Sequence, residues 1–170
     1  MAASCTSGLS PASTPSATGP GVKPPAHLAA GARCPVTLPR PHASPPARLA
    51  ALPPLPVPYI HGWYGNAALW IGVPAGGVLP AGRDFQWPGE WSTKFPWWRA
   101  RAGKLTITGH RLDGPSAGFH GEVPDGYGTI GFVPSGLIWP APGCWQVTGT
   151  VAGWSLTFVT RVRAGPVIAG

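Results

Sequence analysis

The chain has 170 residues and a formal net charge of +7, and only 10% of its residues are charged, against about 25% in an average soluble domain. It contains 25 Gly and 24 Pro together with 9 Trp. This amount of Gly and Pro excludes a coiled coil or a mainly helical bundle, and this amount of Trp excludes a chain that is disordered throughout.

Residues 1–58 form a first region, which lacks Trp, Tyr, Phe, Asp and Glu and holds 14 of the 24 Pro. Large apolar side chains are needed to offset the entropy that a chain loses when it becomes ordered. We therefore expect residues 1–33 to be a disordered, Pro/Ala-rich tether. Residues 34–58 are predicted to be a Pro-rich extended segment that is tied to the domain.

Cys5 follows Ala2, Ala3 and Ser4, which resemble the end of a bacterial lipobox, where a diacylglyceryl group is attached to cysteine. The Ser-, Pro- and Ala-rich residues that come next are similar to the flexible tether of such lipoproteins. The charged and apolar regions of a signal peptide do not precede it. We predict lipidation at Cys5; the alternative is an incidental thiol.

Residues 59–165 are predicted to form one domain, because short runs of alternating apolar and polar residues are separated there by Gly and Pro. In one such run, Leu105 and Ile107 fall on one face, while Thr106 and Thr108 fall on the other. Alternation with a period of two is typical of half-buried antiparallel strands. The predicted strands are 67–73, 104–110, 129–133, 137–139, 144–151 and 155–163.

About seven short strands separated by frequent turns fit a sandwich of two layers. We therefore predict an all-β fold: an immunoglobulin-like antiparallel β-sandwich preceded by the disordered tether. A small barrel is the alternative arrangement. Since no run of about 18 apolar residues occurs, no membrane-spanning helix is expected.

Cys34 and Cys144 stand at the start of the extended segment and at the start of a predicted strand. A disulfide between them would tie the segment to the sandwich and would place the protein in an oxidising compartment. We predict this bond, and two reduced thiols are the alternative.

Residues 84–101 are predicted to be irregular and contain a cluster of Trp and Arg side chains. Exposed Trp rings stack on sugar rings, so Trp91, Trp97, Trp98 and Arg99 are candidate ligand-binding residues. The simpler explanation is that these rings fill one end of the core, with Arg lying over them.

The remaining polar side chains give no recognisable catalytic or metal-binding pattern. A hydrolase would need a cleft in which two polar residues of a small set are in contact. That set comprises His110, Asp113, His120, Glu122 and Asp125. We predict no catalytic residue, no metal and no cofactor.

Residues 131–149 read GFVPSGLIWPAPGCWQVTG and residues 156–159 read LTFV. Together they resemble the C-terminal signature of a family of uncharacterised bacterial extracytoplasmic proteins, often lipoproteins. That family usually has an acidic residue at the position of Gln146. The resemblance implies an exported, all-β, non-enzymatic domain and supplies no catalytic residue.

We therefore expect a non-enzymatic, extracytoplasmic protein of the cell envelope, either anchored by lipid in a structural or protein-interaction role or secreted. Its expected partners are the membrane surface and an envelope protein or glycan. A carbohydrate-binding module that uses exposed Trp residues is the alternative. No nucleic-acid partner is expected, because residues 59–170 carry only eight Lys or Arg against five Asp or Glu.

Overall fold

The structure is a computed structural model that describes residues 27–29, 31–39, 44–52, 60–84, 86–115 and 118–165. These residues contain nine strands, one short α-helix and one 3-10 turn, η1 (Ala75–Gly77), so the predicted all-β class is confirmed. No helix among them is long and apolar enough to cross a membrane. Cys5 and the predicted tether up to residue 26 lie outside the described residues.

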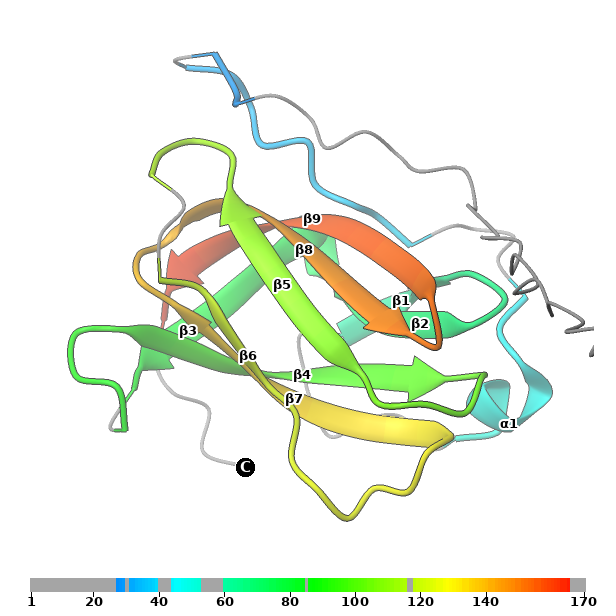
Figure 1. The fold of residues 1–170 in the computed structure, drawn as a ribbon. Helices are drawn as coiled ribbons and strands as arrows, with labels where there is room; N and C mark the ends of the chain where they lie inside the picture. Colours follow the sequence, from blue (N-terminus) through cyan, green and yellow to red (C-terminus); the bar gives the residue numbers. More distant parts are fainter. Residues whose placement is uncertain are drawn as a thin grey trace, which may run out of the picture.

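The strands form two facing layers, and one strand of the second layer also pairs with the first (Figure 1). The first layer has the order β1 (Ile60–Gly65), β2 (Leu69–Pro74), β4 (Trp91–Arg99), β7 (Gly131–Trp139) and β6 (His120–Glu122). The second layer has the order β3 (Val78–Arg83), β9 (Trp154–Ala164), β8 (Gly143–Val151) and β5 (Thr106–Arg111). The end of β3 also pairs with β4, which joins the layers along one edge.

One pairing differs from the antiparallel arrangement that the sequence predicts. β3 and β9 run parallel, from Val78 opposite Arg161 to Ala81 opposite Ala164. At the opposite edge β5 and β6 lie close together, since a Cβ on Gly121 would be 2.6 Å from the Cβ of Ile107. The sandwich is therefore nearly closed, and it shares this property with a barrel.

The core between the layers is rich in aromatic side chains. Phe95 and Trp97 of β4 contact Phe158 of β9, with ring centroids 5.1 and 5.9 Å apart. Trp139 of β7 contacts Trp145 of β8 at 5.4 Å. All five side chains are at most 2% exposed. Aromatic rings from both layers therefore interlock in the middle of the core.

The predicted strands at 67–73, 104–110, 144–151 and 155–163 are confirmed as β2, β5, β8 and β9, whereas 129–133 and 137–139 belong to the single strand β7. The expectation of an irregular stretch at 84–101 is wrong, because it contains β4. Pro96 within β4 lies opposite Pro134 of β7. The two missing N–H donors therefore fall at one position of the ladder, and the strand continues past them.

The arm, by which we mean the described residues among 27–39, is fixed to the second layer. Cys34 and Cys144 form a disulfide across 110 positions, which confirms the predicted bond. The amide of Thr37 donates to the carbonyl oxygen of Val159 over 2.8 Å, and the amide of Val159 donates to Oγ1 of Thr37 over 2.9 Å. The arm therefore lies on the edge of β9 that is left free where its pairing with β3 begins.

We expected the segment 34–58 to be extended, but the structure shows that part of it is helical. It contains α1 (Ala47–Ala50), whose Leu49 is only 1% exposed. The carbonyl oxygen of Pro46 accepts hydrogen bonds from the amides of Leu49 and Ala50. Alanine favours helix, and proline fits at a helix start, so this short sequence forms a turn that buries one Leu.

Candidate functional site

Four connections meet at the end of the sandwich near α1: the β1–β2 turn, the β4–β5 loop, the β6–β7 loop and the β8–β9 turn (Figure 1). Backbone hydrogen bonds join Ala100 to Ala68 and Gly103 to Thr129, both over 2.9 Å. The side-chain amide of Asn66 donates to the carbonyl oxygen of Ser155 over 3.0 Å. These contacts make the four connections one continuous surface.

Arg99 joins two of these loops from inside and is only 3% exposed. Its Nη1 donates to the carbonyl oxygen of Gly103 over 3.0 Å, and its Nη2 donates to those of Tyr127 and Gly128 over 2.9 and 3.2 Å. Burial lowers the pKa of Arg99, although a guanidinium remains protonated in proteins. Because this buried cation donates hydrogen bonds to three loop carbonyls, it fixes the shape of both loops.

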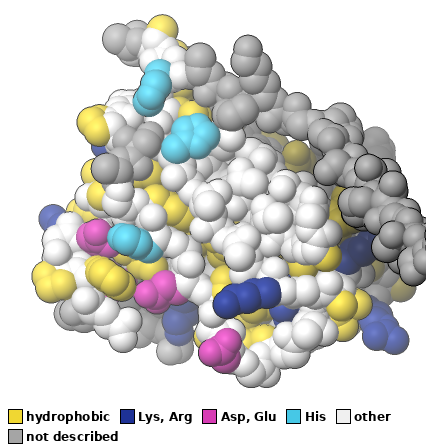
Figure 2. Space-filling view, viewed as in Figure 1, with side chains coloured by type: hydrophobic (Ala, Val, Ile, Leu, Met, Phe, Trp, Pro, Cys, Tyr) yellow, Lys and Arg dark blue, Asp and Glu magenta, His cyan; other side chains and the backbone are white. Residues whose placement is uncertain are grey.

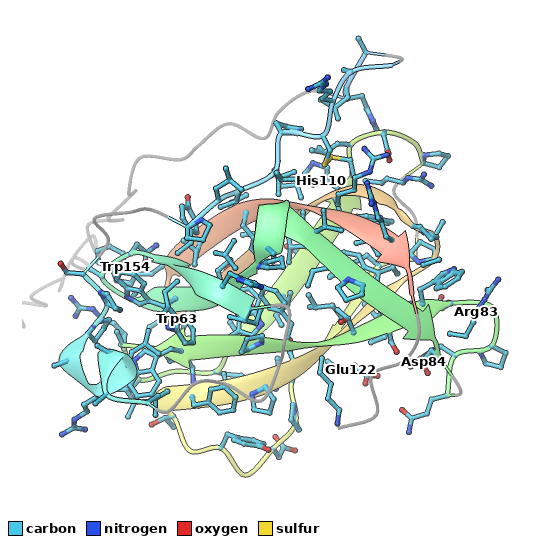
Figure 3. All side chains as sticks on the ribbon, turned by 180° about the vertical axis from the view of Figure 1, so that it is seen from behind. Trp63, Arg83, Asp84, His110, Glu122 and Trp154 are labelled. Atoms are coloured by element: carbon cyan, nitrogen blue, oxygen red, sulfur yellow. A yellow bond between two sulfur atoms is a disulfide. The ribbon has the colours of Figure 1, made fainter. Side chains whose placement is uncertain are left out.

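The surface formed by these loops exposes large apolar side chains. Tyr127 and Trp154 are 45% and 44% exposed, and Ile130 is 55% exposed. The guanidinium carbon of Arg101 lies 5.4 Å from the centre of the Trp154 ring. We call Arg101, Lys104, Tyr127, Ile130 and Trp154 the loop tip. Figure 3 shows Trp154 and Trp63 toward this end of the sandwich, and Arg83 and Asp84 toward the other.

The predicted ligand-binding cluster does not form a surface platform. Trp97 is fully buried, and its Nε1 donates to Oγ of Ser135 over 3.0 Å within the core. Trp91 is half-buried beneath the guanidinium of Arg83, at 4.3 Å. Trp98 is half-buried, and Arg99 binds loop carbonyls. Alternation along β4 sends Trp97 inward and Trp98 outward, so the cluster is divided between two faces.

The five polar residues that we considered for a hydrolase are spread over several elements. His110 lies on β5 opposite Gln146, while His120 and Glu122 lie on β6 and Asp125 lies in the loop that follows. Among the described residues, no three His, Cys, Asp or Glu come together closely enough to hold a metal ion. Figure 2 shows histidine and acidic side chains on the left and centre of this face, with basic side chains in the lower centre as well as at the right edge.

Asp113 pairs with Arg111 rather than with a histidine, with Oδ1 2.7 Å from Nε of Arg111. Burial raises the pKa of Asp113, but the Arg111 hydrogen bond and charge and the backbone amide of Cys144 outweigh it, so this pKa is lower than usual. Gln146 is 5% exposed, and its Oε1 has no hydrogen-bond partner among the described residues. A charge there would be costly to bury.

Trp87 and His120 form a stacked pair on the other side of the sandwich. Their ring centroids are 5.2 Å apart and the rings are nearly parallel, at 14°. Asp84 shapes the turn that carries Trp87, because its Oδ1 accepts hydrogen bonds from the amides of Gln86 and Trp87. Burial raises the pKa of Asp84, but hydrogen bonds from Ser92 and these two amides lower it below its usual value.

Comparison with protein-family models, with curated proteins and with solved structures finds no match to this chain.

Proposed function

We propose that this protein is a non-enzymatic domain of the cell envelope, anchored in the membrane by a lipid on Cys5, with a structural or protein-interaction role. The observation that supports it best is the disulfide between Cys34 and Cys144. Such bonds persist in oxidising compartments outside the cytoplasm. The likeness of residues 131–149 to a family of extracytoplasmic proteins agrees with this location.

The attachment of the arm also supports a role in which the domain is connected to an anchor. A force applied through the N-terminal residues first meets the hydrogen bond from the amide of Leu28 to the carbonyl oxygen of Leu112 and then the disulfide at Cys34, whose covalent bond leads directly to β8. The hydrogen bonds between Thr37 and Val159 connect the arm to β9 as well. The strongest of these attachments therefore delivers the force to the middle of the second layer.

The test is mass spectrometry of the protein recovered from the membranes of its native host. We expect an acylated Cys5, a linked peptide pair containing Cys34 and Cys144, and loss of the salt-resistant part of membrane association in C5S. Unmodified Cys5 together with free thiols at positions 34 and 144 would overturn the proposal.

A carbohydrate-binding module is the second candidate, and the exposed rings of Trp87 and Trp154 favour it. Such rings stack on the apolar faces of sugars. Titration of tryptophan fluorescence with cell-wall glycans tests it, using W87F and W154F to identify the responding ring. An unchanged spectrum at saturating glycan would remove this candidate.

A further inference from the structure

The loop tip combines three kinds of side chain at one end of the molecule. Trp154 and Tyr127 are exposed aromatic rings, Ile130 is a more exposed aliphatic side chain, and Arg101 and Lys104 are exposed cations. Five large hydrophobic residues are exposed in the described part of the chain, and three of them, Tyr127, Ile130 and Trp154, belong to the loop tip. The other two are Leu38 and Trp87. Exposed apolar side chains that gather on one surface mark a site of interaction.

We propose that the loop tip is a membrane-contact surface that docks on a lipid bilayer with anionic headgroups. Trp and Tyr prefer the boundary between headgroups and acyl chains, because their rings are apolar and carry one polar group. Ile130 enters the apolar side of that boundary. Arg101 and Lys104 remain among the headgroup phosphates, to which basic side chains near a surface are attracted.

The construction of the tip suits insertion without reorganisation. Arg99 fixes the carbonyls of Gly103, Tyr127 and Gly128 from below, and Asn66 holds the start of β9. The exposed side chains therefore project from loops whose shape is already set. A surface that is ordered before binding loses less entropy when it binds.

Two observations favour a bilayer over a glycan at this end. Ile130 is more exposed than Trp154 or Tyr127, and a branched aliphatic side chain gives a sugar ring no flat surface on which to stack. Arg101 lies over the ring of Trp154, so it covers area that a stacked sugar would use. The charge at this end also favours anionic headgroups. α1 adds the exposed cation Arg48 to Arg101 and Lys104, whereas the β6–β7 loop contributes one acid, Asp125.

The experiment uses the full chain carrying C5S, oxidised so that the Cys34–Cys144 bond is present and acylation is impossible. Binding is measured by co-sedimentation with vesicles of phosphatidylcholine, alone or mixed with phosphatidylglycerol, and by the emission shift of Trp. We expect binding to the anionic vesicles that weakens as salt is added. W154S and I130S should each weaken it about tenfold, and R101Q about fivefold.

W87S is the matched control, since Trp87 is exposed to a similar extent, 39%, at the other end. It should bind vesicles as the parent does, and thermal unfolding verifies that each variant is folded. Absence of vesicle binding by the folded parent, or equal binding by W154S, I130S and W87S, would overturn the inference. So would a Trp154 emission shift with soluble glycans and none with vesicles. Because acylation plays no part in this assay, its failure leaves the proposed lipid anchor unaffected.

Discussion

Arg99 donates a hydrogen bond from Nη2 to the carbonyl oxygen of Tyr127 over 2.9 Å, across 28 positions of the chain. The donor side chain is 3% exposed, whereas the side chain of the residue that accepts is 45% exposed. A buried cation thus determines where an exposed ring stands. In this protein the shape of the outer surface therefore depends on a side chain that is itself buried.

Replacing Arg99 should therefore loosen the loops as well as lower stability. R99A leaves the carbonyls of Gly103, Tyr127 and Gly128 without their donor, and the expected loss in the free energy of unfolding is about 3 kcal/mol. Urea denaturation measures this loss, and hydrogen exchange of residues 100–104 and 127–130 should become faster. R101A, at an exposed site in the same loop, should change stability by less than about 0.5 kcal/mol. Equal losses in both variants would contradict the role of Arg99.

The disulfide should account for a large part of the stability. The bond closes a loop of 110 positions, and the chain-entropy relation assigns about 5 kcal/mol to a loop of this size. Reductant should lower the Tm of the wild type and leave that of C34S/C144S unchanged. Trypsin should cleave after Arg33 faster in the double variant, because the arm is then fixed only by hydrogen bonds. An arm that is equally resistant in both proteins would disagree with this account.

Gly149 of β8 lies against the ring of Trp97, so that position excludes any side chain. A Cβ there would be 2.4 Å from Cζ3 of Trp97 and 2.9 Å from Cδ2 of Leu69. G149A should destabilise the fold by about 2 kcal/mol through overpacking. The double variant G149A/W97F should lose less stability than the sum of the two single losses, because the smaller ring makes room for the methyl group. Strict additivity in chemical denaturation would show that the two residues do not meet.

Asp113 should make stability depend on pH in the acid range. Its pKa in the folded protein is below the ordinary value of 3.8, so the folded state favours the carboxylate and gains stability above that pH. This gain is lost as the pH falls through the folded pKa. The wild type should lose more stability than D113N between about pH 6 and pH 2. The difference should shrink in the R111Q background, and denaturation curves at several pH values measure it.

Alternation predicted β5, β8 and β9 well because one face of each strand is solvated. Thr148 and Thr157 face each other on the outer surface, with their hydroxyl groups 2.9 Å apart, and such polar positions make the period of two visible. β4 was missed because its sequence does not look like a strand: Pro96 stands in its middle, and the neighbours Trp97 and Trp98 are both large apolar residues although only Trp97 is fully buried. Such a sequence shows no clear alternation of apolar and polar residues.

The loop tip was harder to predict than the sandwich. Trp154 and Tyr127 carry no local signal of exposure, since a Trp or Tyr in the sequence is compatible with core or surface. Ile130 was assigned to a strand that begins one residue later. These side chains are exposed because pairing between strands that are distant in the sequence brings four connections together at one end. The residues around each position do not reveal that pairing. The sequence makes Arg99 a candidate ligand-binding residue, whereas its position as a buried donor to loop carbonyls depends on loops that approach only in three dimensions.

The parallel ladder between β3 and β9 has a consequence for how the protein is made. Residues 78–81 find their partners only at 161–164, and Thr37 also waits for Val159. Because a ribosome delivers the N-terminal part first, neither early segment has its neighbour until β9 has been synthesised. The second layer and the attachment of the arm therefore cannot be completed before β9 is available, although every strand of the first layer precedes it in the chain.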